Sequence, residues 1–191
     1  MASKVSYGIS KGYIAIITED AQGNISYGSP IAVPGLVSLN TDPQSADPTI
    51  FYADNIEYYK SPAQNQGYEG NLVVALANAD FLKNVLGQTQ DSDGVLYENS
   101  NDTQKRFAFG FQADGDDKNR RFWFYDCTAT RPSREHNTKE DSVEPGTDTI
   151  PITMKPRSSD GMVKCVIEEN ATNTAVYNGW FSAVHEKTES L

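Results

Sequence analysis

RRFWFYDC, residues 120–127, is the stretch that decides the fold, because it carries large apolar side chains on both faces of a strand. In an extended backbone, successive side chains point to opposite sides. Phe122 and Phe124 therefore face one way, while Trp123 and Tyr125 face the other. Such a strand lies at the centre of a protein, or one of its faces meets another subunit.

Strand signals continue on both sides of this stretch. Residues 106–113 place three phenylalanines on one face and, through a turn at 114–119, predict a hairpin with residues 120–130. Residues 72–77 form a continuous apolar run, which is typical of a strand covered on both faces. Further strands are expected at 12–18, 25–27, 36–40, 49–52, 149–155, 162–168 and 174–183, with a loop at 58–66.

One helix is expected, directly after the apolar run. Asn78 or Asp80 can cap its start, and Gly87 can adopt the left-handed conformation that ends a helix. Its apolar stripe consists of Phe81, Leu82, Val85 and Leu86. The chain is thus predicted to be one mainly β domain over residues 1–191 with one flanking α-helix. The polar C-terminal end of the chain, residues 184–191, is expected to fray.

A long charged segment at about residues 132–148 separates two of the expected strands. Its only aliphatic residue is Val143, so it cannot bury itself in a core. A linker of this length inside a compact domain is usually functional or disordered. We interpret it as an arm that reaches another molecule.

The charge balance excludes one class of partner. The formal net charge is −10 and the isoelectric point is near 4.6, with acidic residues spread along the chain. A nucleic-acid clamp needs a basic face, whereas an acidic surface repels DNA. No segment has the apolar length that crosses a bilayer, and the start of the chain lacks a secretory pattern. We therefore expect synthesis in a cytoplasm and no membrane partner.

Catalytic and metal-binding patterns are not found in the sequence. Neither His136 nor His185 lies beside a nucleophile motif, and no phosphate-binding or dinucleotide fingerprint occurs. Cys127 and Cys165 lie in strand-like contexts and are expected as free thiols, with a disulfide as the alternative. Their spacing from the histidines does not pair ligands as zinc sites do. We expect no enzyme, no cofactor and no metal.

A binding module is the alternative from another class of protein. Trp123, Tyr125 or Trp180 could form a stacking platform for a carbohydrate on a β-sandwich. Aromatic residues that alternate along a strand more often belong to a core. The pattern therefore favours a protein that assembles with copies of itself.

Five segments in order resemble a known family. They are residues 13–20 (YIAIITED), 27–30 (YGSP), 33–36 (VPGL), 52–55 (YADN) and 138–142 (TKEDS). Their order and spacing, over about residues 8–181, resemble the major tail protein family of long, non-contractile-tailed phages of Gram-positive bacteria.

The resemblance implies a tail tube protein in the virion tail. It implies a β-sandwich or barrel that assembles into hexameric rings, stacked into a hollow tube through which DNA passes. A sheet of each subunit would join its neighbours around the lumen, and loops or arms would lock subunits together. The implied partners are further copies of the chain, the tape measure protein, tail terminator or distal tail proteins, and passing DNA that is not specifically bound. The inner tube of a contractile tail or secretion machine shares this fold and stays an alternative.

Two residue sets follow from this interpretation. Strands with a polar, small-residue face are the candidates for the lumen: Ser38, Asn40, Asp42, Thr149 and Thr153. The arm supplies the candidates for subunit contact: Arg134, Glu135, Asn137, Thr138, Lys139, Glu140, Asp141, Ser142 and Glu144.

Overall fold

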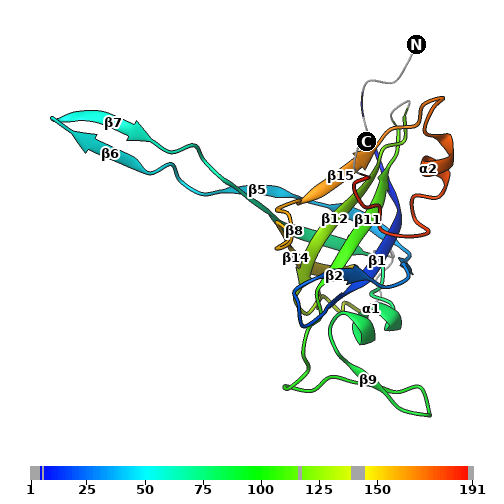
Figure 1. Cartoon of the computed structure of the whole chain (residues 1–191). Helices are drawn as coiled ribbons and strands as arrows, with labels where there is room; N and C mark the ends of the chain where they lie inside the picture. Colours follow the sequence, from blue (N-terminus) through cyan, green and yellow to red (C-terminus); the bar gives the residue numbers. More distant parts are fainter. Residues whose placement is uncertain (1–4, 6, 116–117, 139–144, 189–191) are drawn as a thin grey trace.

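The computed structural model describes residue 5 and residues 7–115, 118–138 and 145–188, and these form a mainly β domain (Figure 1). The strands are β1 (Ile9–Glu19), β2 (Ile25–Tyr27), β3 (Ile31–Val33), β4 (Leu36–Leu39), β5 (Asp42–Ser45), β6 (Ile50–Ala53), β7 (Ile56–Lys60), β8 (Asn65–Val74), β9 (Thr89–Gln90), β10 (Leu96–Tyr97), β11 (Phe107–Ala113), β12 (Arg121–Ala129), β13 (Ser133–Arg134), β14 (Asp148–Lys155) and β15 (Lys164–Ile167). The helices are α1 (Ala79–Asn84) and α2 (Thr174–Asn178).

A single antiparallel sheet folds over on itself to enclose the core. Its order is β2-β1-β11-β12-β14-β8-β4, with β3, β5, β13 and β15 paired to its members. β12 links the two halves, because one of its edges pairs with β11, while the other edge pairs with β15 along its first half and with β14 along its second half. The two ends of the sheet meet at Gly12 of β1, where an added Cβ would lie 2.9 Å from Leu36 Cδ1 of β4. The expected sandwich or barrel is confirmed.

β12 is the central strand that its sequence predicts. Phe124 belongs to the main core, which also contains Ile14, Leu72, Phe109 and Ile150. Trp123 and Tyr125 belong to a second apolar cluster on the other side of the sheet, together with Trp180 and Val184. The second face of β12 is therefore covered by the C-terminal part of the same chain.

Helix α1 lies where the sequence places it. The side chain of Asn78 accepts a hydrogen bond from the backbone N–H of Phe81 at 3.0 Å, which caps the first turn. Phe81, Val85 and Leu86 are buried against the sheet. Gly87 has φ +81°, and an added Cβ would lie 2.6 Å from the Thr103 carbonyl, so glycine is required there.

Two expectations for secondary structure are wrong. Residues 58–66, expected as a loop, contain most of β7 and the start of β8. Residues 174–183, expected as a strand, begin with helix α2. The buried residues Tyr177, Trp180 and Val184 recur at intervals of three and four, which is the spacing of one face of a helix rather than of a strand.

The two cysteines are free thiols, as expected. Cys127 is buried, whereas Cys165 is half-buried on β15. Burial raises the pKa of the Cys127 thiol well above its usual value, so this thiol stays protonated at neutral pH. It packs as a small apolar side chain.

Candidate lumen face and subunit-contact surfaces

One face of the sheet half formed by β5, β8, β14 and the end of β12 is polar and open to solvent. Along β14, Ile150, Ile152 and Met154 point into the core, and the residues between them point outward. β8 alternates in the same way, with Leu72 and Val74 buried. Because side chains alternate between faces, the outward residues of neighbouring strands share one surface.

The five lumen candidates come together on this surface. Asp42 lies opposite Glu69 of β8, which lies opposite Thr153 of β14. A second row joins Ser38, Val73 and Thr149 in the same order. The Asn40 side-chain amide donates a hydrogen bond to Asp42 Oδ2 at 3.0 Å, which places Asn40 beside the first row. We call this surface the polar face.

The register adds residues that the sequence did not suggest. Glu69 of β8 and Thr128 of β12 lie in the row of Asp42 and Thr153. Asn71 of β8 lies between the two rows, and its carbonyl accepts a hydrogen bond from the backbone N–H of Asn40 at 3.0 Å. A shallow hollow of about 420 Å³ on the face is lined by Asp42, Gln44, Glu69, Gly70, Asn71, Gln104, Thr128, Ala129, Thr130, Pro151, Ile152 and Thr153. The alternation of Glu69, Asn71 and Val73 with more buried residues along β8 is the sequence signal that could have found them.

The polar face lies between two strand edges. In the described part of the chain, the main-chain pairing of β5 is with β8, and that of β13 is with β14. β5 and β13 thus lie on opposite sides of the β8–β14 pair. An unpaired strand edge is a template for pairing with another chain.

A long hairpin projects from the body between β5 and β8 (Figure 1). It consists of β6 and β7, which pair with each other in a separate two-stranded sheet, and we call it the hairpin arm. Asp54 and Asn55 at its tip have φ of 52° and 61°, as a type I′ turn requires. The projecting element that the structure describes therefore arises from residues 46–64, whereas the sequence placed an arm at 132–148.

Apolar side chains on the hairpin arm are open to solvent. Phe51, Ile56 and Tyr59 are 58%, 61% and 60% exposed. Phe51 lies opposite Tyr59, and Ala53 lies opposite Ile56, so these four residues share one face of the hairpin. Exposed apolar surface of this kind marks an interaction site.

The segment predicted as an arm is anchored at its two ends. Arg134 Nε lies 3.2 Å from Asp148 Oδ1, and Asp148 Oδ2 accepts a hydrogen bond from the backbone N–H of Ala77 at 2.7 Å. Arg134 is thus held within its own chain, while Glu135, Asn137 and Thr138 are exposed. The remaining arm candidates, Lys139, Glu140, Asp141, Ser142 and Glu144, lie outside the described residues.

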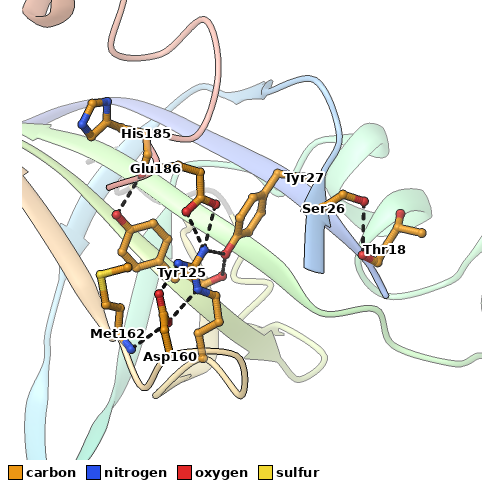
Figure 2. Close-up of polar contacts among 9 residues, drawn as sticks. Thr18, Ser26, Tyr27, Tyr125, Asp160, Met162, His185 and Glu186 are labelled. Carbon is orange, nitrogen blue, oxygen red and sulfur yellow. Dashed lines mark hydrogen bonds and ion pairs between the residues drawn. The ribbon is translucent and has the colours of Figure 1, made fainter. Parts of the chain in front are cut away.

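The C-terminal segment packs on the sheet, so the expectation of a frayed end is wrong for residues 184–186. We call residues 179–186 the C-terminal strap. Val184 is buried, and the Tyr125 hydroxyl donates to the His185 carbonyl at 2.8 Å. Glu186 forms an ion pair with Arg157 at 2.7 Å (Figure 2).

Arg157 joins the strap to the rest of the domain. Its buried guanidinium also pairs with Asp160 at 2.6 Å, and it donates to the Tyr27 hydroxyl at 3.2 Å. The same group lies over the Tyr125 ring, 4.7 Å from its centroid. Figure 2 shows the side chains of Tyr27, Asp160 and Glu186 converging on this centre. Buried charges need such partners, since an unpaired one is costly.

Replacing Tyr27 with Phe is expected to reduce the decrease in the free energy of unfolding that occurs at alkaline pH. Burial raises the pKa of Tyr27 to about 12, against about 10 for an unfolded tyrosine. The folded state therefore holds this proton more tightly, and the stability from Tyr27 is complete below pH 10 and lost as pH rises toward 12. Urea unfolding midpoints at pH 8 and pH 11 measure the difference.

The matched control for this change is Tyr58→Phe, since Tyr58 is exposed on the hairpin arm. At pH 8 the Tyr27 variant should be less stable by about 1 kcal/mol, because it loses the hydroxyl's hydrogen bonds. A Tyr27 variant that loses as much stability as the parent between the two pH values would contradict the assignment.

A glycan-stacking platform is incompatible with the structure. Trp123, Tyr125 and Trp180 are all buried, at 0%, 1% and 3% exposure. A ring must be open to solvent to stack on a sugar.

Within the described residues, no three His, Cys, Asp or Glu side chains are grouped so that they could hold a metal ion, and no helix has the length and apolarity to span a membrane.

A family model described as phage tail tube protein matches residues 2–180. This range includes the polar face, the hairpin arm and the start of the strap. No curated protein matches the chain.

Proposed function

The chain belongs to the phage tail tube protein family, and from this membership we propose that it assembles into hexameric rings that stack into a hollow tube. The tube forms part of the virion tail and gives DNA a path to the host. The observation that carries the proposal is the polar face, where the five lumen candidates share one surface between two strand edges. The role is structural, in keeping with the family.

The two strand edges suggest how a ring closes. β5 of one copy would meet the edge formed by β13 and the end of β12 in the next copy, so that six polar faces form one continuous barrel. Closure of a sheet into a barrel removes its exposed edges. The core side of each sheet half stays within its own subunit, because Ile150, Ile152 and Met154 are already buried there.

The charges of the polar face suit a lumen for DNA. Asp42 and Glu69 lie opposite each other, an arrangement that costs free energy in a sheet and gains nothing for folding. Their neighbours are mainly hydroxyl and amide side chains. A wall with negative charge and few cations does not bind phosphates, so DNA can move along it.

Reversing the charge of this face is expected to slow DNA passage without blocking assembly. Asp42→Lys together with Glu69→Lys would place cations along the tube, and each neutralised phosphate adds to retention of DNA. In a phage complemented with this variant, infectious particles per assembled virion should fall by about tenfold or more. Asp93→Lys, on the exposed loop between β9 and β10, is the control for charge alone. Full infectivity with normal tails would contradict a DNA-facing surface.

We propose the segment at 135–144 as a second contact between subunits. Deleting these ten residues should leave a folded monomer, because Ser133 and Arg134 still face Thr149 and Asp148. Residues 145–147 then connect the two strands, and hairpin loops of three residues are common. The monomer's melting temperature should change little, while polymerisation measured by sedimentation should stop. Normal tubes from the deletion variant would show that the segment is dispensable.

The proposed tube is tested by electron microscopy of the purified full-length chain at high concentration, with and without tail-initiating proteins. Rings with six-fold symmetry or hollow tubes are expected. We also propose that the tape measure protein occupies the lumen before DNA and that terminator and distal tail proteins bind the tube ends. A protein that stays monomeric even with these partners would overturn the proposed function.

A further inference from the structure

An apolar groove opens where β4 faces β11 and β12. Its volume is about 400 Å³, and it is lined by Gly8, Ile9, Val37, Ser38, Leu39, Thr41, Phe111, Phe122, Phe124 and Lys164. The rings of Phe111 and Phe122 stack at 4.9 Å between centroids along its wall. Specific sites for apolar groups have volumes of this order. The groove is therefore large enough for more than one aromatic side chain.

The charges around the groove favour an acidic partner. Among its lining residues, Lys164 is the only charged one. The Lys164 ammonium lies 4.5 Å from the Tyr68 ring centroid, which holds it at the rim. An occupant with apolar side chains and a nearby carboxylate would match this surface.

The apolar face of the hairpin arm has these properties. It presents Phe51, Ile56 and Tyr59, and the turn at its tip supplies a carboxylate at Asp54, directly after Ala53 of the same face. The arm points away from the body that carries the groove, so its tip does not cover the groove of its own chain (Figure 1). The occupant has to come from a second copy.

We propose that the groove is the receptor for the hairpin arm of another copy. Phe51 and Tyr59 enter between Val37 and the phenylalanine stack, and Asp54 of the tip turn meets Lys164. The proposal rests on the proposed tube function and specifies the contact that links its subunits. An apolar centre with a charged rim is the usual anatomy of a protein interface.

Val37→Glu tests the groove without disturbing the fold. Val37 is 51% exposed, so glutamate there stays in water in the monomer, but it is buried once the arm docks. The critical concentration for tube assembly should rise by about tenfold or more. Val95→Glu is the matched control, because Val95 is a 48% exposed valine between β9 and β10 and outside the groove lining. Its tubes should form as those of the parent do.

Cysteine cross-linking tests the pairing directly. Subunits with Val37→Cys are mixed with subunits with Tyr59→Cys, assembled and oxidised, and disulfide dimers between the two are expected. The mixture of Val95→Cys with Tyr59→Cys should give few. The receptor site would be overturned if the parent forms tubes, Val37→Glu assembles as well as the parent, and no Val37–Tyr59 dimers appear. That result would leave the tube function intact. A parent protein that forms neither rings nor tubes overturns the tube function and the docking with it.

Discussion

A double variant, Phe51→Asp with Tyr59→Asp, is expected to remain a folded monomer and to lose tube assembly. The two side chains lie on the apolar face of the hairpin arm and are more than half exposed, so they contribute little to folding of the monomer. Upon docking they become buried, and a carboxylate in an apolar contact is strongly unfavourable. The critical concentration should rise on the order of a hundredfold or more.

Two measurements on the same samples decide this prediction. Thermal unfolding should give a melting temperature close to that of the parent, and sedimentation velocity should show monomers where the parent forms rings or tubes. The control changes the opposite face of β6, with Ile50→Asp and Tyr52→Asp, since these residues lie opposite Lys60 and Glu57. If the control variant assembles as poorly as the Phe51/Tyr59 variant, docking does not depend on one specific face. If the Phe51/Tyr59 variant assembles normally, the arm is not part of the interface.

The parts of the fold that the sequence predicted are those in which burial shapes the residue pattern. β12 shows this most clearly, because its two apolar faces required two covering layers, and the structure provides both. Helix α1 was predictable for the same reason, together with its Asn78 cap and its final glycine at 87. The lumen candidates were chosen by their small polar side chains, and the sheet register brings them to one face.

The hairpin arm was not predicted from the sequence because, in the part of the chain that the structure describes, its two strands form a separate sheet outside the two apolar clusters. Strand alternation arises when one face is dry and the other is wet. β7 is exposed at every position, so its sequence shows no such alternation. The remaining signal was local: Asp54 and Asn55 suit a type I′ turn, and aromatic residues flank them. The prediction of an arm at 132–148 rests on a different signal, because charge excludes a segment from a core but does not show how far the segment extends.

The C-terminal strap makes the second large prediction. Trp180→Ala should reduce the free energy of unfolding by about 3–5 kcal/mol, as large buried side chains do when truncated. Trp180 is buried with Trp123 and Tyr125, its ring stacks on His185 at 5.0 Å, and its carbonyl accepts a hydrogen bond from Trp123 Nε1 at 3.0 Å. Truncation therefore uncovers the second face of β12 as well as leaving a cavity. Urea unfolding measures the loss.

A second substitution at the same position separates packing from polarity. Within the described residues, the indole N–H of Trp180 is buried without a hydrogen-bond acceptor, and such a group costs about 1–3 kcal/mol. Trp180→Phe removes that donor and keeps an aromatic ring, so its loss of stability should be well under half that of Trp180→Ala. Val176→Ala, at an exposed position on α2, controls for the helix and should change stability by less than about 0.5 kcal/mol. If the C-terminal segment were frayed, all three variants would unfold like the parent. A docked strap requires the graded series, because Trp180 is buried in the apolar cluster behind β12 whereas Val176 is exposed.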